Sequence, residues 1–308
     1  MVPDATFTSY YGRPVVKAAP WGWDIPAYLF LGGVAAGSSL LAAGADLTGR
    51  PTLRRTGRIG ALTGISLSFA ALVHDLGRPA RFVNMLRVAK YTSPMSVGTW
   101  ILTGYGPLAG LAGAVEIAHL LPKLPVPVQQ LAAWGGRPAG LGAALLAPAI
   151  ASYTAVLLSD TATPSWHEGY RELPFVFAGS AAAAAGGLGL LGATLRDAGP
   201  ARRLAVGGAV LDLVAGHLRE PRMGLAAEPL HQGSAGTLMR ASKVLTGVGA
   251  VVAVAGHRSR ALSAVAGVAL LAGSVCTRFG IFHAGQASAE DPKYTIVPQR
   301  ERMAADGR

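Results

Sequence analysis

Long apolar segments alternate with short polar ones along most of the chain. Most of them reach about 20 residues, the length that a helix needs to cross a hydrocarbon core of roughly 30 Å. In chain order they are residues 25–46, 59–76, 97–119, 138–159, 173–195, 204–218, 236–256 and 261–282. Asp212 interrupts the sixth, and Arg240 and Lys243 interrupt the seventh, so these two are the weaker spans. The pattern predicts an all-α integral membrane protein with a bundle of eight transmembrane helices, arranged as two four-helix bundles within a single domain, residues 1–308.

An even number of spans places both termini on the same side of the membrane. The connections on that side are the longer ones, and they define the long-loop face: residues 77–96, 159–172 and 218–236. The other connections define the short-link face: residues 50–58, 120–137, 196–203 and 257–260. These short links are rich in Arg and Lys, and Asp197 is their only acid. The positive-inside rule therefore predicts a cytoplasmic short-link face and an extracytoplasmic long-loop face, in the cell membrane.

The composition agrees with a membrane protein, since 51% of the residues are hydrophobic and only 14% are charged. The net charge of +11 is scattered through the connections between apolar spans. Anionic lipid headgroups account for such charge more simply than nucleic acid does, so we expect no nucleic-acid partner. The first apolar span is too long for an ordinary signal-peptide core, and we expect it to remain in the protein.

A single cysteine, Cys276, excludes an internal disulfide and a cysteine-ligated iron–sulfur cluster. The seven histidines show neither HxxxH nor HExxH spacing, so the sequence offers no metal site and no evident haem ligand pair. No GxGxxG motif follows a predicted strand, which leaves a dinucleotide site without support. Glycines four residues apart, such as Gly33 and Gly37, are typical of close helix packing in membranes.

Ionisable side chains within the spans are candidates for a functional role, because inserting one at the middle of a membrane helix costs a free energy on the order of 3 kcal/mol. Glu116, with His119 three residues later, is either part of an interfacial pair or one stage of a proton path. We expect Asp212 to pair with an Arg or Lys on a neighbouring helix, and its role is open. Both residues are candidates for a proton path.

Residues 74–100 carry the most distinctive motif, HDLGRPARFVNMLRVAKYTSPMSVGTW, between two long apolar segments. His74 and Asp75 end the second span, and the following Gly77 and Pro79 are helix-stop residues. Arg78 lies within this stop. A Ser-Pro-Met-Ser turn then leads into the third span. Charge and polar chemistry are therefore concentrated where the chain leaves and re-enters the membrane.

This stretch resembles the NrfD/polysulfide reductase membrane-subunit family, in which an H-D-L-G-R-P segment is followed by S-P-M-S-x-G-T-W. Three further segments agree with the family, at residues 23–37 (WDIPAYLFLGGVAAG), 153–158 (YTAVLL) and 278–292 (RFGIFHAGQASAEDP). The four segments occur in the expected order and reach from one end of the chain to the other.

The resemblance implies a quinone-reactive membrane-anchor subunit of a respiratory oxidoreductase complex, with no redox cofactor besides menaquinone or another quinone. Its expected partners are a ferredoxin-like 4Fe–4S subunit and a catalytic subunit with a molybdenum or tungsten bis-pterin cofactor, of the formate dehydrogenase or polysulfide reductase type. The resemblance places the quinone pocket at Trp23, Asp24, Tyr28, His74, Asp75, Arg78 and Tyr153.

Quinone chemistry suits these residue types. Two electrons and two protons convert a quinone to a quinol, and a Tyr hydroxyl can donate to a carbonyl oxygen while His or Asp passes protons. We expect His74, Asp75 and Tyr153 to take part directly. Arg78 is suited to holding Asp75 ionised or to docking an acidic partner. Without the resemblance, Tyr28 and Tyr153 would be assigned to the aromatic belt at the membrane boundary.

The connection at residues 81–96 is expected to dock the iron–sulfur partner, because electron tunnelling requires the last cluster to lie close to the quinone. The residues expected to contact the partner are Arg81, Lys90, Ser93, Pro94, Met95 and Ser96. The alternative is a solvated basic linker beside lipid headgroups.

Two other functions fit the composition. A proton or small-solute transporter would use the intramembrane acids, but such proteins often contain two related halves with broken helices. We find no convincing internal repeat, and the strongest motif is a connection between spans. A passive membrane anchor without a quinone site would need only the docking connection.

Overall fold

The computed structural model describes residues 14–118 and 126–305, and for residues 126–133 it describes the backbone alone. Within these ranges all regular secondary structure is helical. The long helices are α1 (Asp24–Leu47), α2 (Pro51–Asp75), α4 (Pro94–Ala118), α5 (Val126–Ser159), α7 (Leu173–Gly192), α8 (Gly199–Met223), α9 (Gly233–Ala255) and α10 (Arg260–Glu290). The shorter ones are α3 (Arg81–Met85), α6 (Pro164–His167), the 3-10 helix η1 (Gly224–His231) and α11 (Lys293–Ala305).

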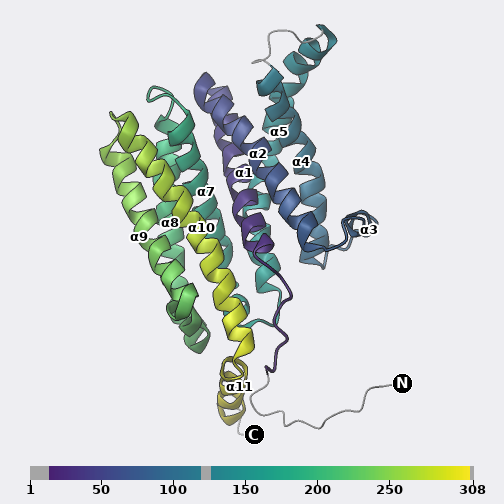
Figure 1. The fold of residues 1–308 in the computed structure, drawn as a ribbon, viewed down its shortest axis with the longest axis vertical. Helices are drawn as coiled ribbons and strands as arrows, with labels where there is room; N and C mark the ends of the chain where they lie inside the picture. Colours follow the sequence, from purple (N-terminus) through teal and green to yellow (C-terminus); the bar gives the residue numbers. More distant parts are fainter. Residues whose placement is uncertain (1–13, 119–125, 306–308) are drawn as a thin grey trace.

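The long helices run along one common direction and form two groups (Figure 1). In the first group, α1 and α4 each contact both α2 and α5; in the second, α7 and α9 each contact both α8 and α10. Helix α1 joins the groups because it also contacts α7 and α10. Small residues allow this approach, since a Cβ atom added to Gly37 would lie 2.9 Å from the carbonyl oxygen of Ala181 on α7.

Seven of the described helices are long and apolar enough to cross a membrane. They are α1, α2, α4, the part of α5 from Trp134 to Ser159, α7, α9 and α10. The predicted sixth span, residues 204–218, is helical within α8, but it is not among these seven. Arg202, Asp212, His217 and Arg219 make α8 more polar than its neighbours. The described part of the chain is therefore all-helical and consistent with a membrane protein, whereas the eighth span and the position of both termini on one side stay predictions.

Several helices extend beyond the apolar segments that predicted them. Helix α2 begins at Pro51 rather than at residue 59, and α10 continues to Glu290 rather than ending at residue 282. Helix α5 begins at Val126, inside the predicted link 120–137, of which residues 120–125 lie outside the described part of the chain. Hydropathy marks only the part of a helix that suits lipid, whereas backbone hydrogen bonding continues through polar turns at the boundary.

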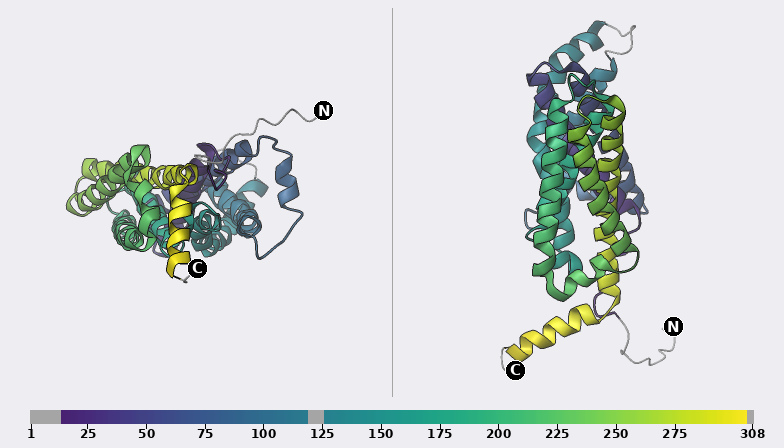
Figure 2. Two further views of the ribbon diagram at one scale, coloured as in Figure 1. Left: turned by 90° about the horizontal axis from the view of Figure 1, so that it is seen from below. Right: turned by 90° about the vertical axis from the view of Figure 1, so that its left-hand side faces the viewer.

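The connections of the long-loop face contain the short helices. Helix α3 interrupts the connection after α2, α6 lies between α5 and α7, and η1 lies between α8 and α9. At this end of the molecule the segment before α1 lies against α10, because the Gln286 side chain donates to the carbonyl oxygen of Ala19, 3.0 Å away. Helix α11 turns away from the bundle axis below α10, and α3 stands to one side of the bundle (Figure 2).

Candidate functional site

Three of the residues predicted to hold the quinone meet where α1 begins and α2 ends. His74 Nδ1 lies 3.1 Å from Asp24 Oδ1, and the ring of Trp23 lies 6.4 Å from the imidazole, centre to centre. The Asp24 side chain is 10% exposed, whereas that of His74 is 74% exposed. The pair thus joins a buried carboxylate to an imidazole open to the long-loop face.

The other predicted residues of this region differ in their surroundings, and Asp75 remains close to Gly22, Asp24 and His74. Asp75 is the last residue of α2 and is half-buried, and Tyr28 is buried in the core one turn into α1. Arg78 is exposed, and no ion pair joins it to Asp75 within the described residues. A direct contact between Arg78 and Asp75 is therefore not seen in this part of the chain, and the docking of an acidic partner by Arg78 stays a prediction.

Tyr153 lies in a different place, in a cavity of about 740 Å³ between α4, α5 and α6. The apolar part of the wall comes from Val97, Ile101, Ala149 and Val156. Tyr153 is 8% exposed, and its hydroxyl has no hydrogen-bond partner within the described part of the chain. A buried hydroxyl without a partner is costly, and a ligand carbonyl is one group that would satisfy it.

Gly98, from the SPMSVGTW motif, makes room for the Tyr153 ring. A Cβ atom at this position would overlap ring atoms Cε2 and Cδ2 of Tyr153. The motif on α4 and the YTAVLL segment on α5 are thus in direct contact, although about 55 residues separate them in the chain. Of the predicted quinone residues, Tyr153 is the one that lines the cavity.

The remaining polar wall of the cavity was missed by the sequence analysis. It includes Asp160, His167 and Tyr170 from the connection after α5, and its other members are Tyr91, Thr92, Ser152 and Ser159. His167 Nδ1 lies 3.0 Å from the carbonyl oxygen of Ser159. The polar residues that directly follow the YTAVLL segment could have indicated this wall of the cavity. They are not distinctive, because polar residues are common in any connection at the membrane boundary.

The residues predicted to dock a partner form an ordered turn at the start of α4. Ser93 precedes Pro94 and accepts a hydrogen bond from the Ser96 backbone N–H at 3.4 Å, the arrangement of a helix N-cap followed by proline. The Ser96 hydroxyl donates to the Val88 carbonyl oxygen at 3.0 Å and accepts from the Lys90 N–H at 2.9 Å. The two serines of the motif therefore fix the shape of the turn.

The outer surface of this turn is apolar as well as basic. Tyr91 is 90% exposed and Met95 is 50% exposed, while Val83 and Val88 are also exposed. Arg81 and Lys90 contribute positive charge beside them. Helix α3 is held against α2 by an edge-to-face contact between Phe82 and Phe69, with ring centres 4.8 Å apart. The docking role remains a prediction.

The two predicted proton-path residues lie in different helix groups. Asp212 is buried in α8, and the nearest positive charges are Arg278 on α10 and Arg219 on α8. Within the described residues no ion pair includes Asp212, so the expected salt bridge does not form. Arg278 instead donates to the Phe177 carbonyl oxygen at 2.8 Å and lies over the Phe177 ring.

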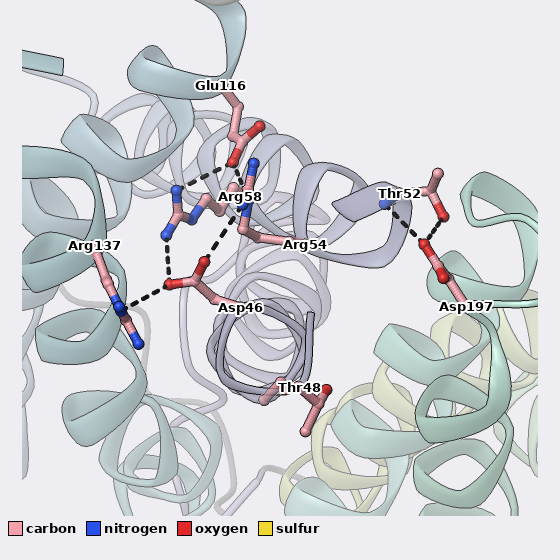
Figure 3. Close-up of polar contacts among 9 residues, drawn as sticks. Asp46, Thr48, Thr52, Arg54, Arg58, Glu116, Arg137 and Asp197 are labelled. Atoms are coloured by element: carbon pink, nitrogen blue, oxygen red, sulfur yellow. Dashed lines mark hydrogen bonds and ion pairs between the residues drawn. The ribbon is translucent and has the colours of Figure 1, made fainter. Parts of the chain in front are cut away.

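Glu116 belongs to an ion-pair cluster at the short-link face (Figure 3). Its Oε1 accepts from Arg54 Nε at 2.7 Å and from Arg58 Nη1 at 3.1 Å. Asp46 lies 3.4 Å from each of these arginines and 3.5 Å from Arg137. Arginines on α2 are thus the partners of Glu116; His119, the partner considered from the sequence, lies outside the described residues.

A second polar contact in Figure 3 joins the two helix groups. Asp197, in the link between α7 and α8, accepts from the Thr52 hydroxyl at 2.6 Å and from the Thr52 backbone N–H at 3.0 Å. The Thr52 hydroxyl is the main cause that lowers the pKa of Asp197 below its usual value, and Arg50 and Arg196 add to the effect. The carboxylate caps the first turn of α2, a favourable place for negative charge.

No group of three His, Cys, Asp or Glu residues that could hold a metal ion occurs in the described part of the chain. A family model described as "Polysulphide reductase, NrfD" matches residues 15–206, which is more than half of the chain. The match includes three of the four family-like segments and ends before the fourth, at residues 278–292. No curated protein matches the chain.

Proposed function

The chain belongs to the NrfD polysulphide reductase family, and from this premise we propose that it is the quinone-reactive membrane-anchor subunit of a respiratory oxidoreductase. The family consists of quinone-interacting membrane subunits that generally partner with iron–sulfur and molybdopterin subunits. In the finer proposal, electrons pass between menaquinone, or another quinone, and a ferredoxin-like 4Fe–4S subunit. That subunit serves a molybdenum or tungsten bis-pterin catalytic subunit.

The observation that carries the proposal is the cavity at Tyr153. It combines an apolar wall with one buried hydroxyl that lacks a partner among the described residues, and its volume of about 740 Å³ lies in the range of small-molecule sites. These features fit a quinone ring, which is flat and apolar and carries carbonyl acceptors at its edge. The residues that line the Tyr153 cavity therefore fit a quinone, the ligand that the family implies.

Each part of the cavity has a task in this proposal. A bound quinone supplies the two-electron, two-proton chemistry. The Tyr153 hydroxyl donates a hydrogen bond to a carbonyl oxygen and orients the ring, while Val97, Ile101 and Val156 exclude water from its faces. The His74–Asp24 pair and Asp75 remain proposed proton donors and acceptors at the same end of the molecule, and Glu116 and Asp212 remain proposed stages of a transmembrane proton path.

The test is the binding of 2-heptyl-4-hydroxyquinoline N-oxide, a quinone analogue, to the full chain purified in detergent. Replacing Tyr153 by Phe removes one hydrogen bond, worth about 1 kcal/mol, so we expect the affinity to fall roughly 5- to 10-fold. The matched control is Tyr105→Phe, because Tyr105 is also a buried tyrosine of this helix group, but its hydroxyl bonds to Ser39 at 2.8 Å and it does not line the cavity.

The outcomes separate the candidate functions. If the unmodified chain does not bind the analogue, it is a passive anchor and the proposal is wrong. If the chain binds it and the Tyr153→Phe variant binds equally well, the quinone site lies elsewhere, and Asp75→Asn is the next variant to examine. Transport of protons or a solute by the chain alone in vesicles would favour the transporter.

A further inference from the structure

We propose that His167 is the group through which the Tyr153 cavity exchanges protons with water on the long-loop face. This inference rests on the proposed function, because it concerns the same cavity. It assigns a task to a residue outside the motifs that identify the family.

The position of His167 is fixed by its neighbours in α6. The Trp166 ring is 1% exposed, and its Nε1 donates to the Ile281 carbonyl oxygen on α10 at 2.9 Å. Ser165 donates through its hydroxyl to the Ala226 carbonyl oxygen of η1 and through its backbone N–H to Ser288 Oγ. A helix of only four residues is therefore held from two sides, and His167 at its end lines the cavity.

The hydrogen bond of the ring determines its tautomer. A backbone carbonyl oxygen can only accept, so the Nδ1 atom that lies 3.0 Å from the Ser159 oxygen carries a proton. In the neutral imidazole, Nε2 then has a free lone pair and can accept a proton. A histidine that exchanges protons requires this arrangement, in which Nδ1 is fixed by a hydrogen bond and Nε2 can bind and release a proton.

Exposure places the ring between the cavity and the solvent. His167 is exposed, whereas Tyr153 is 8% exposed. The ordinary pKa of a phenol, about 10, is too high for rapid proton exchange near neutral pH, whereas histidine is the side chain suited to it. Tyr153 can therefore orient the ligand, and His167 can accept or supply the proton.

The charged and titratable groups around His167 come from three segments. Asp160 and Tyr153 face the cavity from the end of α5, Tyr91 does so from the connection before α4, and the Tyr170 ring lies 6.3 Å from the imidazole. Glu168 is the next residue in the chain. The contacts of α6 with α10 and η1 described above involve groups that do not titrate.

The proton balance follows directly. When quinol is oxidised, His167 Nε2 accepts the proton of one quinol hydroxyl and releases it to water, and the second proton leaves through the proposed His74–Asp24 pair or Asp75. The two electrons pass to the iron–sulfur partner. In quinone reduction the same groups supply the two protons. Both protons of a turnover are then exchanged on the long-loop face, the face proposed for docking.

The experiment measures the dissociation constant of the same quinoline N-oxide as a function of pH, from about pH 5.5 to pH 8.5, around the ordinary pKa of histidine. The key variant is His167→Asn, whose side-chain amide can retain the bond to the Ser159 oxygen but has no group at the place of Nε2. The matched control is His257→Asn on the short-link face, because the Nδ1 atom of His257 also lies beside a backbone carbonyl oxygen, that of Val254 at 3.3 Å.

We expect the plot of log Kd against pH to contain a step for the unmodified chain and for His257→Asn that is absent for His167→Asn. An unchanged step in His167→Asn would overturn the inference. If Tyr153→Phe at the same time binds the quinoline N-oxide more weakly, the quinone site at Tyr153 is supported and only the proposed role of His167 is wrong.

Discussion

Tyr153 shows how a single residue acquires its role from a neighbour that is distant in the chain. Its ring fits against α4 only because residue 98 is a glycine, and its hydroxyl has no partner in the part of the protein that the structure describes. In the SPMSVGTW motif, Gly98 therefore leaves the space that the Tyr153 ring occupies, and Ser93 and Ser96 fix the shape of the preceding turn.

Replacing Gly98 by Ala should displace the Tyr153 ring. Overpacking of this kind costs typically about 1 to 3 kcal/mol, so we expect a lower thermal unfolding midpoint and weaker binding of the quinone analogue. The control is Gly110→Ala on the same helix, where a Cβ atom would meet open space. Its binding should equal that of the unmodified chain. Equal binding by both variants would show that the ring position does not matter.

At the scale of helices, the cluster around Glu116 joins four elements. Arg54 and Arg58 come from α2, Asp46 from α1, Glu116 from α4 and Arg137 from α5. Glu116 and Arg58 are 1% and 6% exposed, so each depends on the other for compensation of its charge. The cluster lies opposite the long-loop face and fixes how the first group of helices meets at its other end.

Replacing Glu116 by Gln leaves Arg58 buried without its closest carboxylate. The loss of one partner of a buried ion pair costs about 3 to 5 kcal/mol, which should appear as a large fall in the thermal unfolding midpoint in detergent. Arg137→Ala is the control, since that side chain is 65% exposed and surface pairs contribute about 0 to 1 kcal/mol. Similar effects of the two variants would contradict a structural role for the buried pair.

The contact between Asp197 and Thr52 predicts a specific dependence of stability on pH. Because the pKa of Asp197 is lowered in the folded protein, its stabilisation is complete above the unfolded pKa of about 4 and is lost as the pH falls through the folded pKa. The difference in unfolding midpoint between the unmodified chain and Asp197→Asn should therefore be constant near neutral pH and shrink below about pH 4. A difference that does not change with pH would show that the carboxylate charge is unimportant.

At the scale of the whole molecule, the two ends of the bundle differ in charge. On the short-link face arginines also bind the ends of helices. Arg260 donates to the carbonyl oxygens of Leu190 and Ala193 at the end of α7, and Arg202 donates to the Ala253 oxygen near the end of α9. Positive charge there complements the helix dipoles and agrees with the proposed cytoplasmic position of this face.

This orientation can be tested with cysteines in a chain whose own cysteine, Cys276, is replaced by Ser. A membrane-impermeant maleimide added to intact cells should label Tyr91→Cys on the long-loop face and leave Arg258→Cys unlabelled. Inverted membrane vesicles should give the opposite result. Labelling of Arg258→Cys in intact cells would reverse the proposed orientation, and with it the side on which the partner docks.

The sequence predicted the helices better than it predicted the site. Residues 25–46 and 173–195 correspond closely to α1 and α7, because transfer of apolar side chains into lipid is a property of each segment by itself. The family-like segments point to the Asp24–His74 neighbourhood and to the cavity beside Tyr153, and the roles of these residues stay predictions. They did not lead to His167, since nothing in a short polar connection shows that it folds back over the end of α5.

The amino-acid sequence is sufficient to identify a helical membrane protein of the NrfD family, because the lengths of apolar segments and the order of motifs are properties of the linear chain. Which polar groups meet becomes visible only in the folded molecule. Glu116 binds Arg54 and Arg58 on α2 rather than a residue of its own helix turn. The predicted quinone residues lie in two places, around the Asp24–His74 pair and in the Tyr153 cavity. The reason is that such meetings depend on the rotation and separation of packed helices, which small residues on several helices determine together.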